Sequence, residues 1–445
     1  MLAKLGMTKV DEKLATQMRE VARQIFLDAL PQTSVAAAFG QCVQYEKGVL
    51  RVCDDLYNLE AYTRVLAVAI GKAAPAMAEA LVQALGSRVA GFIASSVNPS
   101  ERLAQFVYFH GGHPLPNEES VRAATAIQSV LETLDESSLV IYLLSGGGSA
   151  IVERPIFGQI SLDDLIATYG VLVNCGAPIA EINAVRKHLS AVKGGRLAQA
   201  AYPAQQVSIM VSDVPENQLD ALASGPTMPD SSNVDQCYQI VEQHDILPNL
   251  PPSVRVIFEQ KLLQETPKSD DPAFVRARWW PILSSGLAAK NAAAVAAANG
   301  FAVEIENTCD DWDYQRAADH LLARLRKLRQ GASKVCLISA GEVTVKVEGQ
   351  AGTGGRNQQF ALYCAERIAG ENVTVLSAGT DGVDGNSGAA GAVADGTTVT
   401  RAGKDGVQQA LRKFNAAAVF DCLGDAIVTG PTGNNVRDLR VLLAY

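Results

Sequence analysis

The sequence predicts an α/β fold in two domains, built around a largely parallel sheet. Apolar runs of strand length alternate along the chain with longer segments of helical periodicity, a pattern typical of strand–helix–strand units. A Pro-rich and charged stretch over residues 248–281 interrupts this alternation and predicts the boundary between the domains. With 445 residues, the chain has the length of about two to three domains.

The first domain is expected over residues 1–270 and should hold the larger sheet. Its predicted strands cover 64–70, 139–144 and 206–211, and its predicted helices cover 72–85 and lie near 161–174, 178–189 and 191–201. The segment 64–70 (RVLAVAI) is a continuous apolar run, as in a strand that is buried on both faces.

The second domain, residues 280–445, is expected to repeat the alternation on a smaller scale. We predict helices near 284–299, near 313–329 and from Arg356 onward, and strands over 301–305, 334–339, 342–347 and 372–377. The strands over 334–339 and 342–347 should pair through Ala340-Gly341. For the extreme C-terminus, packing back onto the first domain is left open.

The composition excludes several classes of protein. Apolar residues make up 48% of the chain and charged residues 19%, which excludes a disordered chain. The formal charge of −9, with no basic tract, argues against nucleic acid as a partner. Outside Ala-rich segments the longest strongly apolar stretch is residues 139–144, whereas a membrane span needs roughly 20 residues. Residues 1–6 lack the apolar core of a signal peptide, so we expect a cytoplasmic protein with no membrane partner.

Polar or Gly-rich loops follow five predicted strands directly. They are Gly71-Lys72, residues 145–149, Ser212-Asp213, residues 339–342 and residues 378–388. Because the carboxyl ends of strands in an open α/β sheet border the ligand crevice, a polar site assembled from loops of both halves is expected.

The most specific of these loops is Ser145-Gly146-Gly147-Gly148-Ser149, the triple-glycine loop. Its glycines let backbone N–H groups converge on an anion, and a serine at each end can add a hydrogen bond. A tight strand-to-helix turn is the alternative interpretation. The dinucleotide fingerprint G-x-G-x-x-G/A fails here, because Ile151 stands where a small residue is needed.

Two cations stand at predicted helix starts, each preceded by glycine. Lys72 follows Gly71, and Arg356 follows Gly354 and Gly355. A cation in the first helical turn faces the positive end of the helix dipole, which is unfavourable unless an anion lies between them. Both positions therefore predict anion binding, with a solvated side chain as the alternative.

A basic cluster and three carboxylates complete the predicted site. Asn183, Arg186 and Lys187 share one helix face by their spacing, and Lys193 follows shortly after them. These groups could attract an anionic metabolite, or they could form a solvated face. The carboxylates Asp213, Asp381 and Asp384 are candidate Mg²⁺ ligands, and Asp213 is also a candidate general base. Turn formation is the alternative for all three.

The sequence resembles the class II glycerate 2-kinases, whose C-terminal domain is of the MOFRL type. In the first half the matching motifs are 112–118 (GHPLPNE), 144–150 (LSGGGSA), 181–190 (EINAVRKHLS), Lys193-Gly194-Gly195, Ser212-Asp213-Val214 and 223–230 (ASGPTMPD). In the second half they are 354–358 (GGRNQ), 379–385 (GTDGVDG) and 429–436 (TGPTGNNV). They follow the family's order over nearly the whole chain. Relatives often carry an aspartate where this chain has Gly388, which weakens the loop around Asp384 as a metal site.

The resemblance implies ATP-dependent phosphorylation of D-glycerate to 2-phosphoglycerate with a divalent metal such as Mg²⁺. It implies a larger Rossmann-like domain, a smaller MOFRL-type domain and an active site in the cleft between them. The family's important lysine, aspartate and arginine fall on Lys72, Asp213 and Arg356. Arg186 or Lys193 could then clamp the glycerate carboxylate.

Two other functions remain as alternatives. Some members of the family carry the name hydroxypyruvate reductase, but that activity needs a nicotinamide site, and the G-x-G-x-x-G/A fingerprint is absent. A non-catalytic sensor of sugar acids or phosphosugars would keep the anion-binding loops and have no need of Asp213. We expect a small-molecule substrate as the partner and leave a homodimer open.

Overall fold

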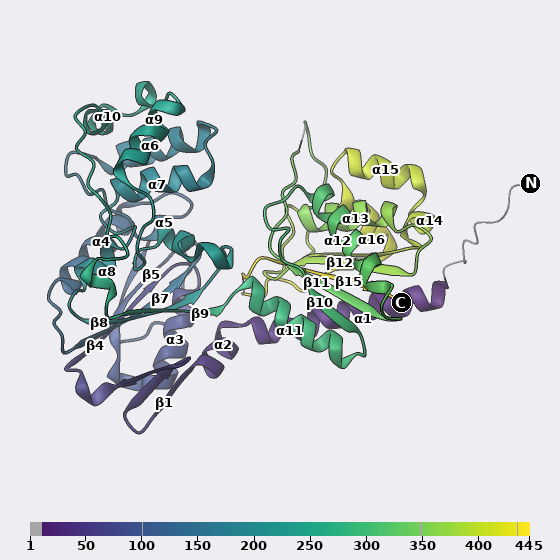
Figure 1. The fold of residues 1–445 in the computed structure, drawn as a ribbon, viewed down its shortest axis with the longest axis horizontal. Coiled ribbons are helices and arrows are strands. Elements are labelled where there is room, and N and C mark those ends of the chain that lie inside the picture. The colour runs from purple at the N-terminus through teal and green to yellow at the C-terminus, as the bar shows by residue number, and fades with distance from the viewer. Residues whose placement is uncertain (1–10, 100, 348, 434) are drawn as a thin grey trace, which may run out of the picture. The chain divides into compact units, whose positions relative to one another are not determined.

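The computed structural model describes residues 11–99, 101–347, 349–433 and 435–445, and it divides into two compact units (Figure 1). The parallel-sheet unit comprises residues 38–282, and the mixed-sheet unit comprises residues 11–37 and 283–445. The predicted α/β class is confirmed, since each unit packs helices against a six-stranded sheet. The prediction that the chain lacks a signal peptide concerns residues 1–6, and residues 1–10 lie outside the described residues. Among the described helices none is long and apolar enough to cross a membrane.

The sheet of the parallel-sheet unit has the strand order β6-β5-β4-β7-β8-β9. The bounds are β4 (Arg64–Ile70), β5 (Ala90–Ser95), β6 (Phe106–His110), β7 (Ser138–Ser145), β8 (Gln205–Val211) and β9 (Ala277–Leu283). The first five run parallel, with Ile70 opposite Leu144 and Ser145 opposite Val211. The carboxyl ends of β4, β7 and β8 therefore meet at one edge.

Helices of this unit form two groups. The helices are α3 (Ala74–Leu85), α4 (Glu118–Leu131), α5 (Gly148–Ile151), α6 (Leu162–Asn174), α7 (Ile179–Leu189), α8 (Arg196–Ala200), α9 (Val234–Gln243) and α10 (Pro252–Glu259). α4 packs Ile127 and Leu131 against the central strands. In contrast, α6, α7, α9 and α10 share a separate apolar core and stand apart from the sheet (Figure 1). A small antiparallel sheet consists of β1 (Val43–Glu46), β2 (Val49–Val52) and β3 (Asp55–Asn58).

The sheet of the mixed-sheet unit has the order β10-β11-β15-β12-β13-β14. Its strands are β10 (Ala302–Ile305), β11 (Val335–Ala340), β12 (Val373–Gly379), β13 (Gly391–Asp395), β14 (Ala426–Ile427) and β15 (Asp438–Ala444). Only β10 and β11 pair in parallel, whereas β15 runs antiparallel between β11 and β12. The sheet of this unit is therefore mixed, because β13 and β15 each run antiparallel to both neighbours. The C-terminal segment forms β15, within this sheet.

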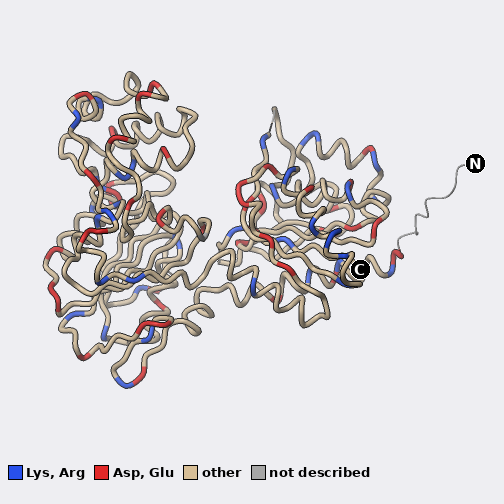
Figure 2. Tube along the Cα trace, viewed as in Figure 1, with Lys and Arg blue, Asp and Glu red and all other residues tan. Residues whose placement is uncertain are grey.

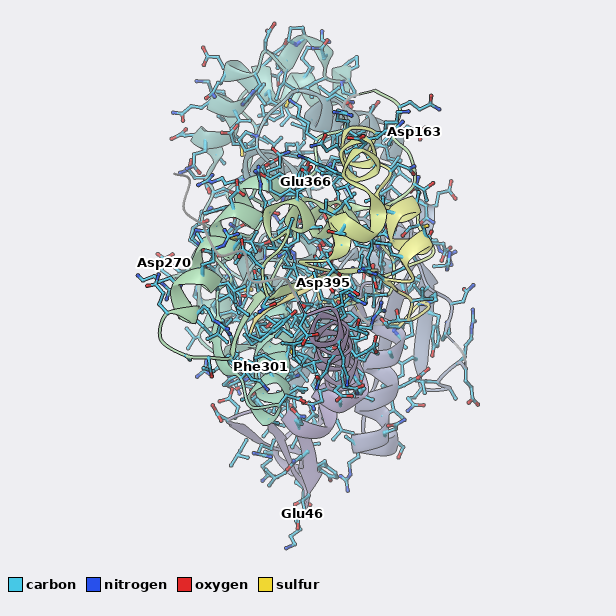
Figure 3. The ribbon with its side chains drawn as sticks, turned by 90° about the vertical axis from the view of Figure 1, so that its right-hand side faces the viewer. Glu46, Asp163, Asp270, Phe301, Glu366 and Asp395 are labelled. Atoms are coloured by element: carbon cyan, nitrogen blue, oxygen red, sulfur yellow. The ribbon has the colours of Figure 1, made fainter. Side chains whose placement is uncertain are left out.

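The N-terminal helix α1 (Glu12–Ala29) belongs to the mixed-sheet unit, although residues 1–270 were assigned to the first domain. It packs Ile25 and Phe26 into the core formed with β12 and β15. Arg19 forms an ion pair with Asp395, which is labelled beside α1 in Figure 3. The other helices are α2 (Val35–Cys42), which runs across the division, and α11 (Ser285–Ala298), α12 (Tyr314–Arg329), α13 (Arg356–Arg367), α14 (Thr398–Ala402), α15 (Lys404–Arg412) and α16 (Ala416–Leu423).

Two further predictions differ from the structure. The stretch 248–281, predicted as the domain boundary, contains α10 and most of β9, and the division falls just beyond it, after Ile282. The segment 342–347 is not a strand, since only an isolated bridge joins Thr344 to Asp313. Lys and Arg are interspersed with Asp and Glu along both units, without a long tract of one sign (Figure 2).

Candidate functional site

At the carboxyl edge of the parallel sheet, Lys72 is held against the triple-glycine loop. The Lys72 amide donates to the Gly146 carbonyl at 2.9 Å, and the Ala73 amide donates to Ser145 Oγ at 3.0 Å. Gly71 has φ +121°, and a Cβ there would collide with the Ser145 carbonyl, so only glycine permits this approach. α3 begins at Ala74, so Lys72 precedes the helix. Its side chain is exposed and forms no ion pair with any residue of the described ranges.

The triple-glycine loop makes room for three titratable side chains. A Cβ on Gly146 would collide with the carboxylate of Asp213. A Cβ on Gly147 would lie 3.0 Å from Cδ2 of His113 and 3.3 Å from Cε of Lys72. The structure therefore brings together Lys72, Asp213 and the loop, as expected from the strand ends, and adds His113.

His113 is the residue that sequence reasoning missed. It follows β6 and stands in the run Gly111-Gly112-His113-Pro114, a composition typical of a turn between elements. Burial and the charge of Lys72 lower the pKa of the imidazole, and the carboxylate of Asp213 opposes them. The one available signal was the place of His113 in the motif 112–118.

A strained loop over residues 216–225 packs against the glycines. Ala223 and Ser224 have φ +50° and +61°, values that are unfavourable for residues other than glycine. A Cβ on Gly148 would lie 2.7 Å from that of Ala223, and the hydroxyls of Ser149 and Ser224 are 2.9 Å apart. Backbone strain of this kind collects at functional sites.

The basic residues of α7 differ in their partners. Lys187 is buried and pairs with Asp230 at 3.0 Å and with Asp220 at 3.2 Å, so a solvated face is excluded for it. Arg186 lies over the ring of Tyr169 at 4.6 Å, and no carboxylate among the described residues pairs with it. Burial lowers the pKa of its guanidinium. Arg186 is thus a partly buried cation without a protein anion, and Asn183 precedes it by one turn.

Lys193 takes a structural position. Its side chain is 1% exposed and forms an ion pair with Glu153, which is fully buried. Glu153 also accepts hydrogen bonds from the Tyr169 hydroxyl and from Ser190 Oγ. The charge of Lys193 is therefore neutralised inside the protein. Of the two residues predicted to clamp a carboxylate, only Arg186 is without an anionic partner among the described residues.

In the mixed-sheet unit, Arg356 is the first residue of α13, as predicted. Its Nε and Nη2 reach the Asp438 carboxylate at 2.6 and 3.1 Å, and its Nη2 reaches Glu342 at 2.8 Å. Burial lowers the pKa of Arg356, but the hydrogen bond and charge of Asp438 outweigh it and raise the pKa above its usual value. An incoming anion would compete with two carboxylates for this arginine.

Asp384, a candidate metal ligand, instead caps α13. Its carboxylate accepts the amides of Asn357 at 3.0 Å and Gln358 at 2.8 Å, and it is 1% exposed. Burial raises its pKa to about 6, although these amides act in the opposite direction. Asp381 is partly exposed, and its Oδ1 accepts the Val383 amide at 3.0 Å. No cluster of three or more His, Cys, Asp or Glu within the described ranges could hold a metal ion.

All five residues predicted in this unit line one cavity of about 480 Å³, namely Gly354, Gly355, Arg356, Asp381 and Asp384. The glycine loop of this unit, residues 352–355, does not have all its backbone amides free to bind an anion. The Gly352 amide donates to the Lys413 carbonyl, and those of Thr353 and Gly354 donate to the side chains of Asn415 and Asn386.

Comparison with known proteins gives two family matches and several relatives. Residues 21–259 match a domain of unknown function, DUF4147, and residues 335–438 match the MOFRL family. The chain is 36% identical to D-glycerate 2-kinase of Thermotoga maritima, over 85% of this chain and 90% of the relative. It is 34% identical to a putative hydroxypyruvate reductase of Agrobacterium vitis, over 85% and 87%. A crystal structure of glycerate kinase from Thermotoga maritima matches with a TM-score of 0.83 at 31% identity, over 97% and 100%.

Proposed function

The chain belongs to the glycerate kinase family that combines a DUF4147 domain with a MOFRL domain, and we propose that it phosphorylates D-glycerate to 2-phosphoglycerate with ATP. The observation that carries the proposal is the gathering of Lys72, His113 and Asp213 around two consecutive glycines at a sheet edge. Phosphoryl transfer needs positioned cations and anion-binding amides more than covalent chemistry from the protein.

In the proposed reaction the C2 hydroxyl oxygen of glycerate attacks the γ-phosphorus of ATP. The O–H bond of the hydroxyl and the bond to the leaving ADP break, and the new O–P bond forms. Lys72 would balance charge on the transferring group, since its ammonium is exposed and without an ion-pair partner among the described residues. Asp213 would orient the hydroxyl, accept its proton or hold Mg²⁺. His113 is a second group placed to accept that proton.

Arg186 is the group that we propose for the glycerate carboxylate. A guanidinium fork matches a carboxylate with two hydrogen bonds. Lys187 and Lys193 already have buried carboxylate partners, whereas Arg186 has none among the described residues. Asn183, one turn earlier on α7, would add a neutral hydrogen bond.

Asp213 and Asp381, taken as separate candidates in their own units, each fit a Mg²⁺ ion better than Asp384 does. Mg²⁺ needs only one or two carboxylates when phosphates supply further ligands, which agrees with the lack of a larger acidic cluster in the described residues. Both oxygens of Asp384 are used in capping α13. A bound Mg²⁺ would neutralise charge on the ATP phosphates.

A coupled assay tests the proposal. Purified protein is supplied with ATP, Mg²⁺ and D-glycerate, and the product is read through enolase without added phosphoglycerate mutase. A signal means that 2-phosphoglycerate forms. A signal only with the mutase means the 3-phosphate, and the assignment of the C2 hydroxyl fails. Consumption of NAD(P)H with hydroxypyruvate, without ADP formation, would replace the kinase with the reductase.

A further inference from the structure

The cavity at the start of α13 has one wall made of apolar side chains. Val343, Val345 and Val347 alternate along an extended segment and all line the cavity. Val347 is 46% exposed and Val383, also on the cavity, is 47% exposed. Apolar surface left uncovered inside a concave site is typical of ligand pockets.

Phe414 adds a strained aromatic ring to the lining of this cavity. Its φ is +48°, which is unusual for a bulky side chain. The turn that holds it is bound to the glycine loop, since the Lys413 carbonyl accepts the Gly352 amide at 3.0 Å and Asn415 Oδ1 accepts the Thr353 amide at 2.9 Å. Strain maintained by such contacts at a pocket is typical of ligand clamps.

Glycerate does not explain this wall. Each of its three carbons bears an oxygen, so it has no apolar face to bury. A purine base has two flat apolar faces that pack against aromatic and aliphatic side chains. The amides of Gly352, Thr353 and Gly354 are already used, so the loop offers little to phosphate.

We infer that the cavity lined by Val343, Val345, Val347 and Phe414 binds the purine base of the nucleotide donor. The inference rests on the proposed kinase function and adds a place for the donor on the mixed-sheet unit. The apolar wall contacts the base, so adenosine itself should compete for the cavity.

A fluorescent ADP analogue, mant-ADP, tests the inference by direct titration of the full chain. Adenosine and AMP should both displace the probe. Val347→Asp and Phe414→Asn should each weaken probe binding at least tenfold. Both variants should fold, because Val347 is half exposed and asparagine tolerates positive φ. The matched control is Val275→Asp, since Val275 is 74% exposed and lies in the parallel-sheet unit.

The outcomes separate this inference from the proposed function. If the wild type phosphorylates glycerate but both cavity variants bind mant-ADP normally, the cavity assignment is wrong and the kinase stands. Displacement by tripolyphosphate and not by adenosine also overturns it. If the wild type shows neither nucleotide binding nor turnover, the inference and the kinase proposal fail together.

Discussion

Lys72, Lys187 and Lys193 look alike in the sequence and differ in the structure. Lys72 is exposed and without an ion pair among the described residues, whereas Lys187 and Lys193 are buried against carboxylates. Their partners Asp230 and Glu153 lie about 40 residues away along the chain. Local spacing predicts which residues share a helix face but not which distant carboxylates meet them, so pairing could not be predicted.

Replacement of Lys72 by Ala should lower kcat by at least ~100-fold, about 2.7 kcal/mol of transition-state stabilisation. The physical reason is the loss of an unneutralised cation beside the triple-glycine loop. Steady-state kinetics with D-glycerate and ATP measure the effect. Lys290→Ala removes an exposed lysine of α11 and should leave kcat unchanged. A loss below about tenfold for Lys72→Ala would contradict the proposal that Lys72 balances charge on the transferring group.

Arg186→Gln should raise the KM for D-glycerate by roughly 10–100-fold, the value of a hydrogen bond to a charged group. The effect on kcat should be smaller, because the carboxylate is not a reacting group and its charge does not change during the transfer. Initial rates over a range of glycerate concentrations separate the two parameters. An unchanged KM would exclude Arg186 as the carboxylate-binding residue.

His113→Ala should lower kcat by ~10²–10⁴-fold if the imidazole accepts the hydroxyl proton. Added imidazole should restore part of the activity of this variant, since a free base can enter the vacated space. A merely structural role predicts no such rescue. Activity of His113→Ala is therefore to be measured with and without imidazole at constant pH and ionic strength.

At the scale of elements, most of the helices and strands that the sequence predicts are present in the structure. The segment 342–347 is the instructive exception, because its alternating valines line a cavity and not a sheet. β15 was not predicted, because no turn or helix pattern after residues 438–444 marks the end of a strand. The carboxylate that caps the N-terminus of α13 belongs to Asp384, which follows the helix in sequence. Sequence patterns for helix caps concern the residues beside the helix, so they do not predict this cap.

The Asp384 cap makes the free energy of unfolding depend on pH. Its folded pKa of about 6 lies above the unfolded value of 3.8, so the folded state binds more protons between these values. The contribution of Asp384 to stability therefore falls as pH rises from about 4 to 6. Asp384→Asn removes this component, so the variant should gain on the order of 2 kcal/mol relative to wild type between pH 4 and 7. Urea unfolding at both pH values measures the free energy of unfolding of the variant and of the wild type. The same pH dependence in both proteins would contradict the prediction.

At the scale of the whole molecule, the two units do not follow the order of the chain. The sequence predicts a division near residues 270–280, close to the observed one after Ile282. It does not reveal that α1 joins the mixed-sheet unit, because that assignment depends on packing against strands more than 300 residues away. Such packing leaves no trace in composition or periodicity near the N-terminus.

Deletion of residues 1–34 should destabilise the mixed-sheet unit selectively. The deletion uncovers the core that Ile25 and Phe26 now fill, and each of these side chains is completely buried. Calorimetry should show loss of one unfolding transition, with the transition of the parallel-sheet unit unchanged. Phe26→Asp in the full chain should reproduce the effect. Equal shifts in both transitions would contradict the expectation that α1 stabilises the mixed-sheet unit selectively.

The central place of β15 has a consequence for synthesis on the ribosome. Residues 38–282 form a self-contained sheet and can fold while the rest of the chain is still being made. The mixed sheet has a gap between β11 and β12 until Ala444 leaves the exit tunnel. Throughout this interval α1, which precedes every other described element in the chain, has no completed surface to pack on. Its apolar face, which carries Ile25 and Phe26, therefore stays uncovered on the nascent chain until the sheet is complete.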